Sequence, residues 1–153
     1  MPLSKKDITT RVQEEHGHLK QEMEKIWQLI DAEVSKDEFV QWRMDLLFLL
    51  RDFHNDLQKH FDLEEEGGFM SDIVRVAPQH THAVAQLYEE HQQMSSGLNT
   101  ILADLKALTT MERTEFNRIR SQIEDFLTLL KTHEAAEGNL MVSTYLQDEG
   151  SGD

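Results

Sequence analysis

Helix breakers are scarce in this sequence. Its 153 residues include only two prolines, Pro2 and Pro78, and seven glycines, so long stretches run without a residue that interrupts a helix. Within those stretches apolar residues recur at spacings of three and four, which is the period of one face of an α-helix, and no stretch alternates in the manner of a strand. The sequence therefore predicts an all-α protein.

The apolar periodicity predicts four long helices. They cover residues 5–33, 36–66, 78–108 and at least 110–137, and a continuation of the last helix through Gly138 to Leu146 is left open. The stretch 69–77 is expected to be irregular or a short helix. Short connections favour an antiparallel, up-down-up-down four-helix bundle. We expect residues 1–146 to form this single domain and residues 147–153 to be an acidic, flexible tail.

Capping patterns place the ends of these helices. Ser35 and Glu38 match the Ser/Thr-x-x-Glu capping box at the start of the second helix. Thr109 and Glu112 match it at the start of the fourth. The pair 67–68, two consecutive glycines, is expected to end the second helix.

The absence of cysteine limits the chemistry of any metal site. Disulfides, thiolate metal sites and cysteine nucleophiles are excluded, because the chain has no cysteine. A bound metal must then be held by imidazole and carboxylate groups. The chain has eight histidines and 29 acidic residues to supply them.

The net charge of −14 argues against two classes of partner. Such a chain repels nucleic acid and anionic membrane surfaces, so we expect neither as a partner. The first residues lack the apolar region of a signal peptide. No apolar run approaches the ~18 residues needed to span a membrane. We therefore expect a cytoplasmic protein.

Each predicted helix carries a histidine in line with its apolar stripe, and two helices also carry a glutamate there. His16, for example, lies four residues after Val12 and three before Leu19. Buried imidazoles and carboxylates are costly unless they are paired or bound to metal. The candidate metal ligands are His16, His60, Glu64, His91, His133 and Glu137.

These candidates lie at one height in the predicted bundle. Residues at equal height on two antiparallel helices have their sequence midpoint in the connecting turn. The midpoints between consecutive candidate sites fall within a few residues of the turns predicted from caps and breakers. His80 fails this test and is placed near a bundle end, whereas His18, His54 and His82 lie off the stripes and are assigned to the surface.

The two halves of the sequence repeat one pattern. Glu-Glu-His ends at His16 and again at His91, and His-x-x-x-Glu begins at His60 and again at His133. A two-fold-like pair of helix hairpins would give each of two metal ions two histidines, with the two glutamates between the ions. This mixture of imidazole and carboxylate donors suits iron, with manganese or zinc as lesser options.

Four stretches, EEHGHL, HFDLEEEGGF, EEHQQM and HEAAEGNLM, resemble the helix signatures of the hemerythrin-like (HHE cation-binding) domain family. The resemblance covers essentially the whole chain. It implies a non-heme di-iron site with two carboxylate-bridged iron ions. The implied ligands are His16, His60, His91 and His133, and the implied bridges are Glu64 and Glu137.

One position departs from the oxygen-carrying hemerythrins, which have a fifth histidine from a His-x-x-x-His pair on the third helix. Leu87 and Ser95 stand four residues either side of His91, so that pair is absent. The departure argues against simple reversible oxygen carriage. Glu134 or Glu65 is a candidate for an additional ligand, with a solvated or outer role preferred for Glu65.

Several functions remain open at this point. The favoured one is a di-iron module that binds or senses oxygen, nitric oxide or iron. As a sensor it would need a separate protein partner, which the sequence does not identify. The alternative is a di-iron redox enzyme acting on oxygen or peroxide, although no substrate pocket is marked. A purely structural bundle fits less well, because the candidate ligands share one height and recur in both halves. A ferritin-like site also fits less well, because its motif Glu-x-x-His occurs only at Glu15-x-x-His18, whose residues straddle the stripe.

Overall fold

The computed structural model describes residues 5–146, which form four long helices and three short helical segments. The long helices are α1 (Lys5–Asp31), α2 (Phe39–Glu65), α4 (Thr81–Ala107) and α5 (Arg113–Met141). The short segments are α3 (Phe69–Val76), the 3₁₀ turn η1 (Pro78–His80) and the π-helical turn η2 (Val142–Leu146). The described part of the chain contains no strand, so the all-α prediction is confirmed.

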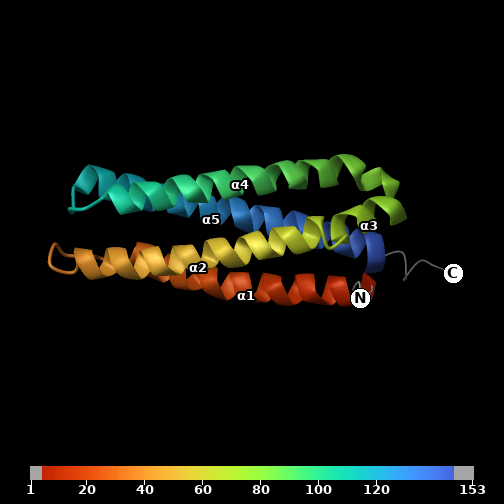
Figure 1. Ribbon diagram of the computed structural model, residues 1–153, viewed down its shortest axis with the longest axis horizontal. Helices are drawn as coiled ribbons and strands as arrows, with labels where there is room; N and C mark the ends of the chain where they lie inside the picture. The colour runs from red at the N-terminus through yellow and green to blue at the C-terminus, as the bar shows by residue number, and fades with distance from the viewer. Residues whose placement is uncertain (1–4, 147–153) are drawn as a thin grey trace.

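The four long helices form an antiparallel bundle (Figure 1). Helix α1 packs against α2 and α5, and α4 packs against the same two helices. The α1–α2 and α4–α5 turns lie at one end of the bundle, and α3, the start of α1 and η2 lie at the other. The predicted up-down-up-down arrangement is therefore present.

Two apolar clusters fill the bundle at different heights. The larger cluster occupies the end with the two long-helix turns and includes the fully enclosed Ile26, Leu50 and Ile123. The smaller cluster lies at the α3 end and includes Val12 and Leu87. Along α1, α4 and α5 the stripe histidines fall between these clusters, so apolar side chains separate that layer from both bundle ends.

The predicted capping box is formed before α2, but the helix begins at Phe39, three residues later than predicted. Ser35 Oγ accepts a hydrogen bond from the Glu38 backbone N–H at 3.3 Å, and the Ser35 backbone N–H donates to Glu38 Oε1 at 3.1 Å. This reciprocal pair closes a turn, and α2 itself begins at Phe39. The capping box is present, but it belongs to the turn that precedes the helix.

The predicted start of the fourth helix was wrong. Helix α5 begins at Arg113, with Glu112 as its N-cap, and no Thr109 side-chain cap is formed. The Glu112 carboxylate accepts hydrogen bonds from the backbone N–H groups of Thr114 and Glu115, at 3.2 and 2.8 Å. A glutamate that caps these exposed N–H groups directly does not need the threonine three residues earlier.

The segment between α2 and α4 is a short helix that covers the end of the bundle. Two glycines make the reversal: a Cβ on Gly67 would clash with the carbonyl oxygen of Leu63, and Gly68 has a φ of 91°, in the left-handed region. Helix α3 then places Phe69, Met70 and Ile73 in the smaller apolar cluster. The third long helix begins at Thr81, later than predicted, because η1 takes up Pro78–His80.

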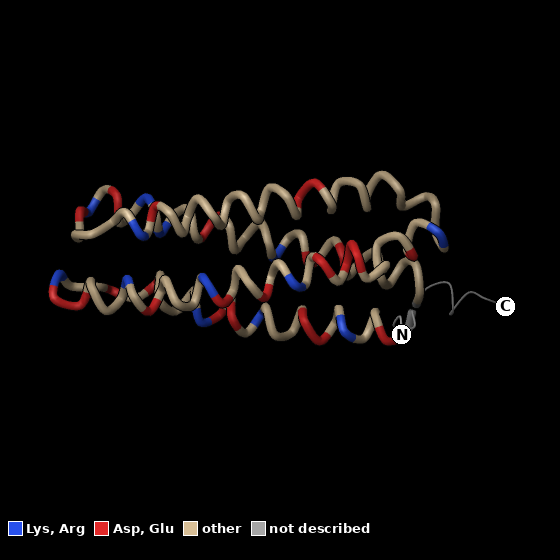
Figure 2. Tube along the Cα trace, viewed as in Figure 1, with Lys and Arg blue, Asp and Glu red and all other residues tan. Residues whose placement is uncertain are grey.

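Acidic residues outnumber basic ones, 29 to 15, and they occur along all four long helices (Figure 2). No helix in the described part of the chain combines the length and apolar character needed to cross a membrane. The predicted tail, residues 147–153, lies outside the described residues.

Candidate metal centre

Six polar side chains meet in the layer between the two apolar clusters. Helices α1 and α4 each supply one histidine, and α2 and α5 each supply a histidine and a glutamate. Both carboxylates are enclosed, with Glu64 0 % and Glu137 1 % exposed. The structure brings together all six residues singled out from the sequence: His16, His60, Glu64, His91, His133 and Glu137.

The histidines form two pairs. His16 and His60, from α1 and α2, have ring centroids 4.6 Å apart. His91 and His133, from α4 and α5, have ring centroids 4.9 Å apart. We call these the α1–α2 pair and the α4–α5 pair. Each pair, together with the two glutamates, makes a group whose ligand atoms all lie within 4.8 Å of one another.

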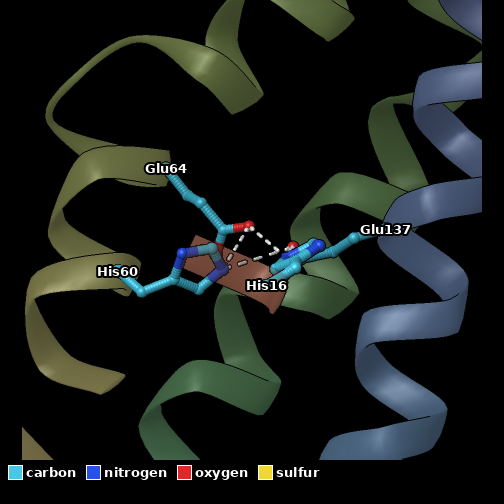
Figure 3. A group of neighbouring side chains, drawn as sticks. All are labelled: His16, His60, Glu64 and Glu137. Atoms are coloured by element: carbon cyan, nitrogen blue, oxygen red, sulfur yellow. Dashed lines mark hydrogen bonds and ion pairs between the residues drawn. The ribbon is translucent and has the colours of Figure 1, made fainter. Parts of the chain in front are cut away.

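Glu64 divides its two oxygens between the pairs. Its Oε2 lies 3.3 Å from His60 Nε2 and 3.9 Å from His16 Nε2. Its Oε1 lies 3.1 Å from His91 Nε2. The carboxylate therefore spans the space between the α1–α2 pair and the α4–α5 pair (Figure 3 draws the first of these groups).

Glu137 is divided in the same way from the opposite side. Its Oε2 lies 3.0 Å from His16 Nε2, and its Oε1 lies 2.5 Å from His133 Nε2 and 3.5 Å from His91 Nε2. Two carboxylates thus each present one oxygen to one histidine pair and the second oxygen to the other. This is the arrangement that two bridging ligands between two cations require.

Several of these atoms have no hydrogen-bond partner among the described residues. They are His60 Nε2, His133 Nε2 and both oxygens of Glu64. A buried polar atom left unpaired costs roughly 1–3 kcal/mol, and more when it is charged. These four atoms belong to the two His/Glu groups of the layer, and a cation in each group would satisfy them. The donor set therefore fits bound metal.

Without metal, the carboxylates raise the pKa values of the four histidines. Burial lowers the pKa of His16, but its contacts with Glu137 and Glu64 outweigh burial and raise that pKa to about 10. The same balance raises the pKa of His91 to about 10 and raises the pKa of the other two histidines. Burial raises the pKa of Glu137, yet hydrogen bonds hold it well below its ordinary value. Protons on His16 and His91 can thus offset the charge of the two carboxylates in the metal-free centre.

Three further glutamates hold histidine rings from outside the cluster. Each accepts a hydrogen bond at Nδ1, which leaves Nε2 pointing into the centre. The contacts are Glu15 Oε2 to His60 Nδ1 at 2.8 Å, Glu65 Oε2 to His91 Nδ1 at 2.7 Å, and Glu90 Oε1 to His133 Nδ1 at 2.7 Å. The outer role preferred for Glu65 matches this contact.

The roles of Glu15 and Glu90 were not predicted from the sequence. The signal was visible in the repeated Glu-Glu-His motif, where the acid before each histidine recurs in both halves. What the motif did not reveal is that each of these acids contacts the histidine of the next helix, His60 or His133, and not its own neighbour.

The two halves of the centre differ in the residue that follows the histidine of the His-x-x-x-Glu motif. After His60 this residue is Phe61, whose ring stacks on His91 with centroids 3.8 Å apart and an interplanar angle of 13°. The equivalent residue in the second half is Glu134. Burial raises the pKa of Glu134, whose largest electrostatic interactions are with the α1–α2 pair, and its Oε1 has no hydrogen-bond partner.

A second difference affects the outer glutamates. Glu65, directly after Glu64, holds His91, but the residue directly after Glu137 is Gly138, which has no side chain to hold His16. A Cβ at Gly138 would meet nothing within 4 Å. The His16 side chain is also the most exposed of the four, at 16 %, against 2 % for His60 and His91. The α1–α2 side is therefore the open side of the centre.

The remaining histidines lie away from this layer. His80 is in η1 at the bundle end, where its Nε2 lies 3.1 Å from Ser143 Oγ. His82 is exposed and His54 is half-buried. His18 turns toward Asp56 on α2, away from the layer, so Glu15-x-x-His18 does not act as one ligand pair.

The two positions where a fifth histidine could stand on α4 hold side chains with other contacts. Leu87 is buried in the smaller apolar cluster, and Ser95 Oγ donates a hydrogen bond to Gln58 Oε1 at 3.2 Å. Neither side chain offers a ligand to the centre. Tyr88 stands edge-on to His91, with ring centroids 6.4 Å apart.

The chain matches a known protein family over most of its length. The hemerythrin HHE cation binding domain matches residues 7–148, nearly the whole chain. The chain belongs to the hemerythrin HHE cation-binding family. This HHE domain is thus a cation-binding protein, and the two His/Glu groups in its core fit that activity. A search of curated proteins found no match, and neither did a search of solved structures.

Proposed function

We propose that this HHE domain holds two iron ions, with Glu64 and Glu137 bridging them. The observation that supports this most directly is the division of each carboxylate between the two histidine pairs. One ion would take the α1–α2 pair and the other the α4–α5 pair. A single ion would leave one histidine pair and two carboxylate oxygens without a partner.

The donor set favours iron over other common metals. Each ion would have two imidazoles and two carboxylate oxygens, a mixed set that suits iron better than the thiolate sets of structural zinc. Four protein ligands leave open positions on an ion that prefers six. A site with open positions is suited to bind or exchange a small ligand.

We propose that the small ligand is a diatomic molecule, oxygen or nitric oxide, and that it binds on the α1–α2 side. On the other side the Phe61 ring covers His91, and Glu65 fixes that imidazole. On the α1–α2 side His16 is partly exposed, and the neighbouring group is the carboxyl of Glu134. Because burial raises the pKa of that carboxyl, it takes up a proton more readily and can donate a hydrogen bond to a bound anionic ligand.

The same carboxyl favours one alternative, a redox enzyme that acts on oxygen or peroxide. Such chemistry consumes protons, and Glu134, a half-buried acid with a raised pKa beside the open side, is placed to deliver them. A bound ferrous pair would supply electrons for one reduction, and continued reduction would need an external reductant. The two functions differ in whether the ligand is held or turned over.

Nitric oxide titration of the ferrous protein under argon tests the proposal. We expect the wild-type protein to bind nitric oxide, as followed by visible and electron paramagnetic resonance spectra. Glu134→Leu should keep its iron but bind nitric oxide about tenfold more weakly, because one hydrogen bond to the ligand is lost. Asp125→Leu likewise replaces an acid by leucine, at an exposed position of α5, and should leave the affinity unchanged.

Two results would count against this function, and a third would favour the redox enzyme. Iron-loaded protein that reacts with neither nitric oxide nor oxygen would exclude the diatomic ligand. Unchanged nitric oxide affinity in Glu134→Leu, with iron retained, would place the ligand elsewhere. Continuous consumption of peroxide by the wild-type protein would favour the enzyme.

A further inference from the structure

A second group of possible metal ligands lies on the outside of the α1–α2 hairpin. His18 and Glu22 are four residues apart on α1, so they share one face of that helix, and Asp56 faces them from α2. One ligand atom from each residue lies within 4.8 Å of the others. None of the three belongs to the six residues of the core centre.

The polar contacts inside this group are incomplete. His18 Nε2 lies 3.3 Å from Asp56 Oδ2 and 3.2 Å from Glu22 Oε1. One imidazole nitrogen carries at most one hydrogen, so it cannot donate fully to two carboxylates. The hydrogen bond goes to Asp56, and Glu22 Oε1 is left without a hydrogen-bond partner.

Glu22 is enclosed even though its neighbours are on the surface. The residue is 9 % exposed, and the unpartnered oxygen is the one that faces His18. Burial, followed by the neighbouring Asp56 carboxyl, raises the pKa of Glu22 to about 7. Asp52 adds a further negative charge nearby. A cation placed between the three side chains would satisfy the unpaired oxygen and remove the repulsion between the acids.

We propose that His18, Glu22 and Asp56 form a second metal site, which binds one divalent first-row transition ion such as Zn²⁺ or Fe²⁺ independently of the core centre. The imidazole favours these ions over Mg²⁺ and Ca²⁺, which prefer oxygen ligands alone. Three protein ligands at a partly exposed position leave room for water on the ion. The site is therefore suited to exchangeable binding.

The test is a calorimetric titration of the iron-loaded protein with Zn²⁺ after excess iron has been removed. We expect about one further ion to bind per chain. His18→Gln and Asp56→Asn should each weaken that binding at least about tenfold, because each removes one of three ligands. Both positions are exposed or half-buried, so these variants avoid disturbing the enclosed Glu22.

Two controls separate this site from the core. His82→Gln changes an exposed histidine outside the group and should leave the Zn²⁺ affinity unchanged. Iron content should be the same in all variants, since none alters a core residue. Zn²⁺ binding that is absent from the wild type, or that persists at full affinity in both His18→Gln and Asp56→Asn, would overturn the proposal.

Discussion

At the scale of single residues, the centre depends on glutamates that do not reach it. Glu15, Glu65 and Glu90 each fix the ring of a histidine on a neighbouring helix through Nδ1. Such outer contacts set which ring nitrogen is free to bind and how the ring is oriented. They also tie pairs of helices together at the height of the centre.

Glu90→Ala tests this role. The variant should bind iron roughly 10–100-fold more weakly, because His133 loses the contact that orients its ring. Glu89→Ala removes the exposed acid next to it and serves as the control, with no expected change. Competition against a chelator measures both affinities, and equal values for the two variants would show that the outer contact has little effect.

At the scale of helices, the reversal after α2 depends on two consecutive glycines. Gly67 has no room for a side chain beside the Leu63 carbonyl, and Gly68 adopts a left-handed conformation. The reversal sends α3 across the bundle end, where it contributes to the smaller apolar cluster. The smaller cluster closes the metal centre on the side opposite the larger apolar cluster.

Two glycine substitutions should therefore have opposite effects on stability. Gly67→Ala should lower the free energy of unfolding by more than about 1 kcal/mol, because the backbone must shift. Gly97→Ala, inside α4 with open space around the new Cβ, should raise it by about 0.5–1 kcal/mol through helix propensity. Urea unfolding of both metal-free variants measures the difference, and destabilisation by both would contradict the assignment.

The sequence predicted the helices well where periodicity and burial agree. His60, for example, lies three residues beyond Leu57 on one stripe, and both are buried. It predicted helix starts less well. Thr109 and Glu112 fit a capping box in the sequence, but in the structure Glu112 alone caps α5. Eight residues of α3 were too short a segment for periodicity to identify firmly.

The sequence likewise predicted one part of the candidate site and missed another. A histidine in a helical stripe must face the core, so its convergence with three others follows from pattern and height. The partner of an acid outside the stripe depends on side-chain conformation and helix spacing, and for this reason Glu15 and the group around His18 were missed. The sequence shows that Phe61 follows His60 whereas Glu134 follows His133. The effect of this difference on the centre depends on which histidines lie beside each residue, and only the structure shows that.

At the scale of the whole molecule, the bundle encloses a charged layer between two apolar clusters, and its stability must depend on pH. The pKa values of His16 and His91 rise from 6.5 to about 10 in the folded, metal-free protein. A raised folded-state pKa means that the native state binds protons more tightly than the unfolded chain. The resulting stabilisation is complete below pH 6.5 and is lost as the pH rises toward about 10.

Metal-free protein should accordingly unfold at a lower temperature near pH 10 than near pH 7. The unfolding temperature of metal-loaded protein should instead fall as the pH is lowered, because metal takes the place of those protons and acid displaces the metal. Thermal unfolding followed by circular dichroism at several pH values measures both trends. His91→Gln should flatten the alkaline decline of the metal-free form, and a wild-type curve that is already flat would contradict the proposed charge compensation.

Four histidines and two shared glutamates are proposed to hold a pair of iron ions. The most direct measurement is the iron-to-protein ratio after loading with Fe²⁺ under argon and removal of unbound metal. We expect about two iron ions per chain, because each carboxylate faces both histidine pairs. A ratio of one or zero, or a single zinc ion retained in place of iron, would contradict it.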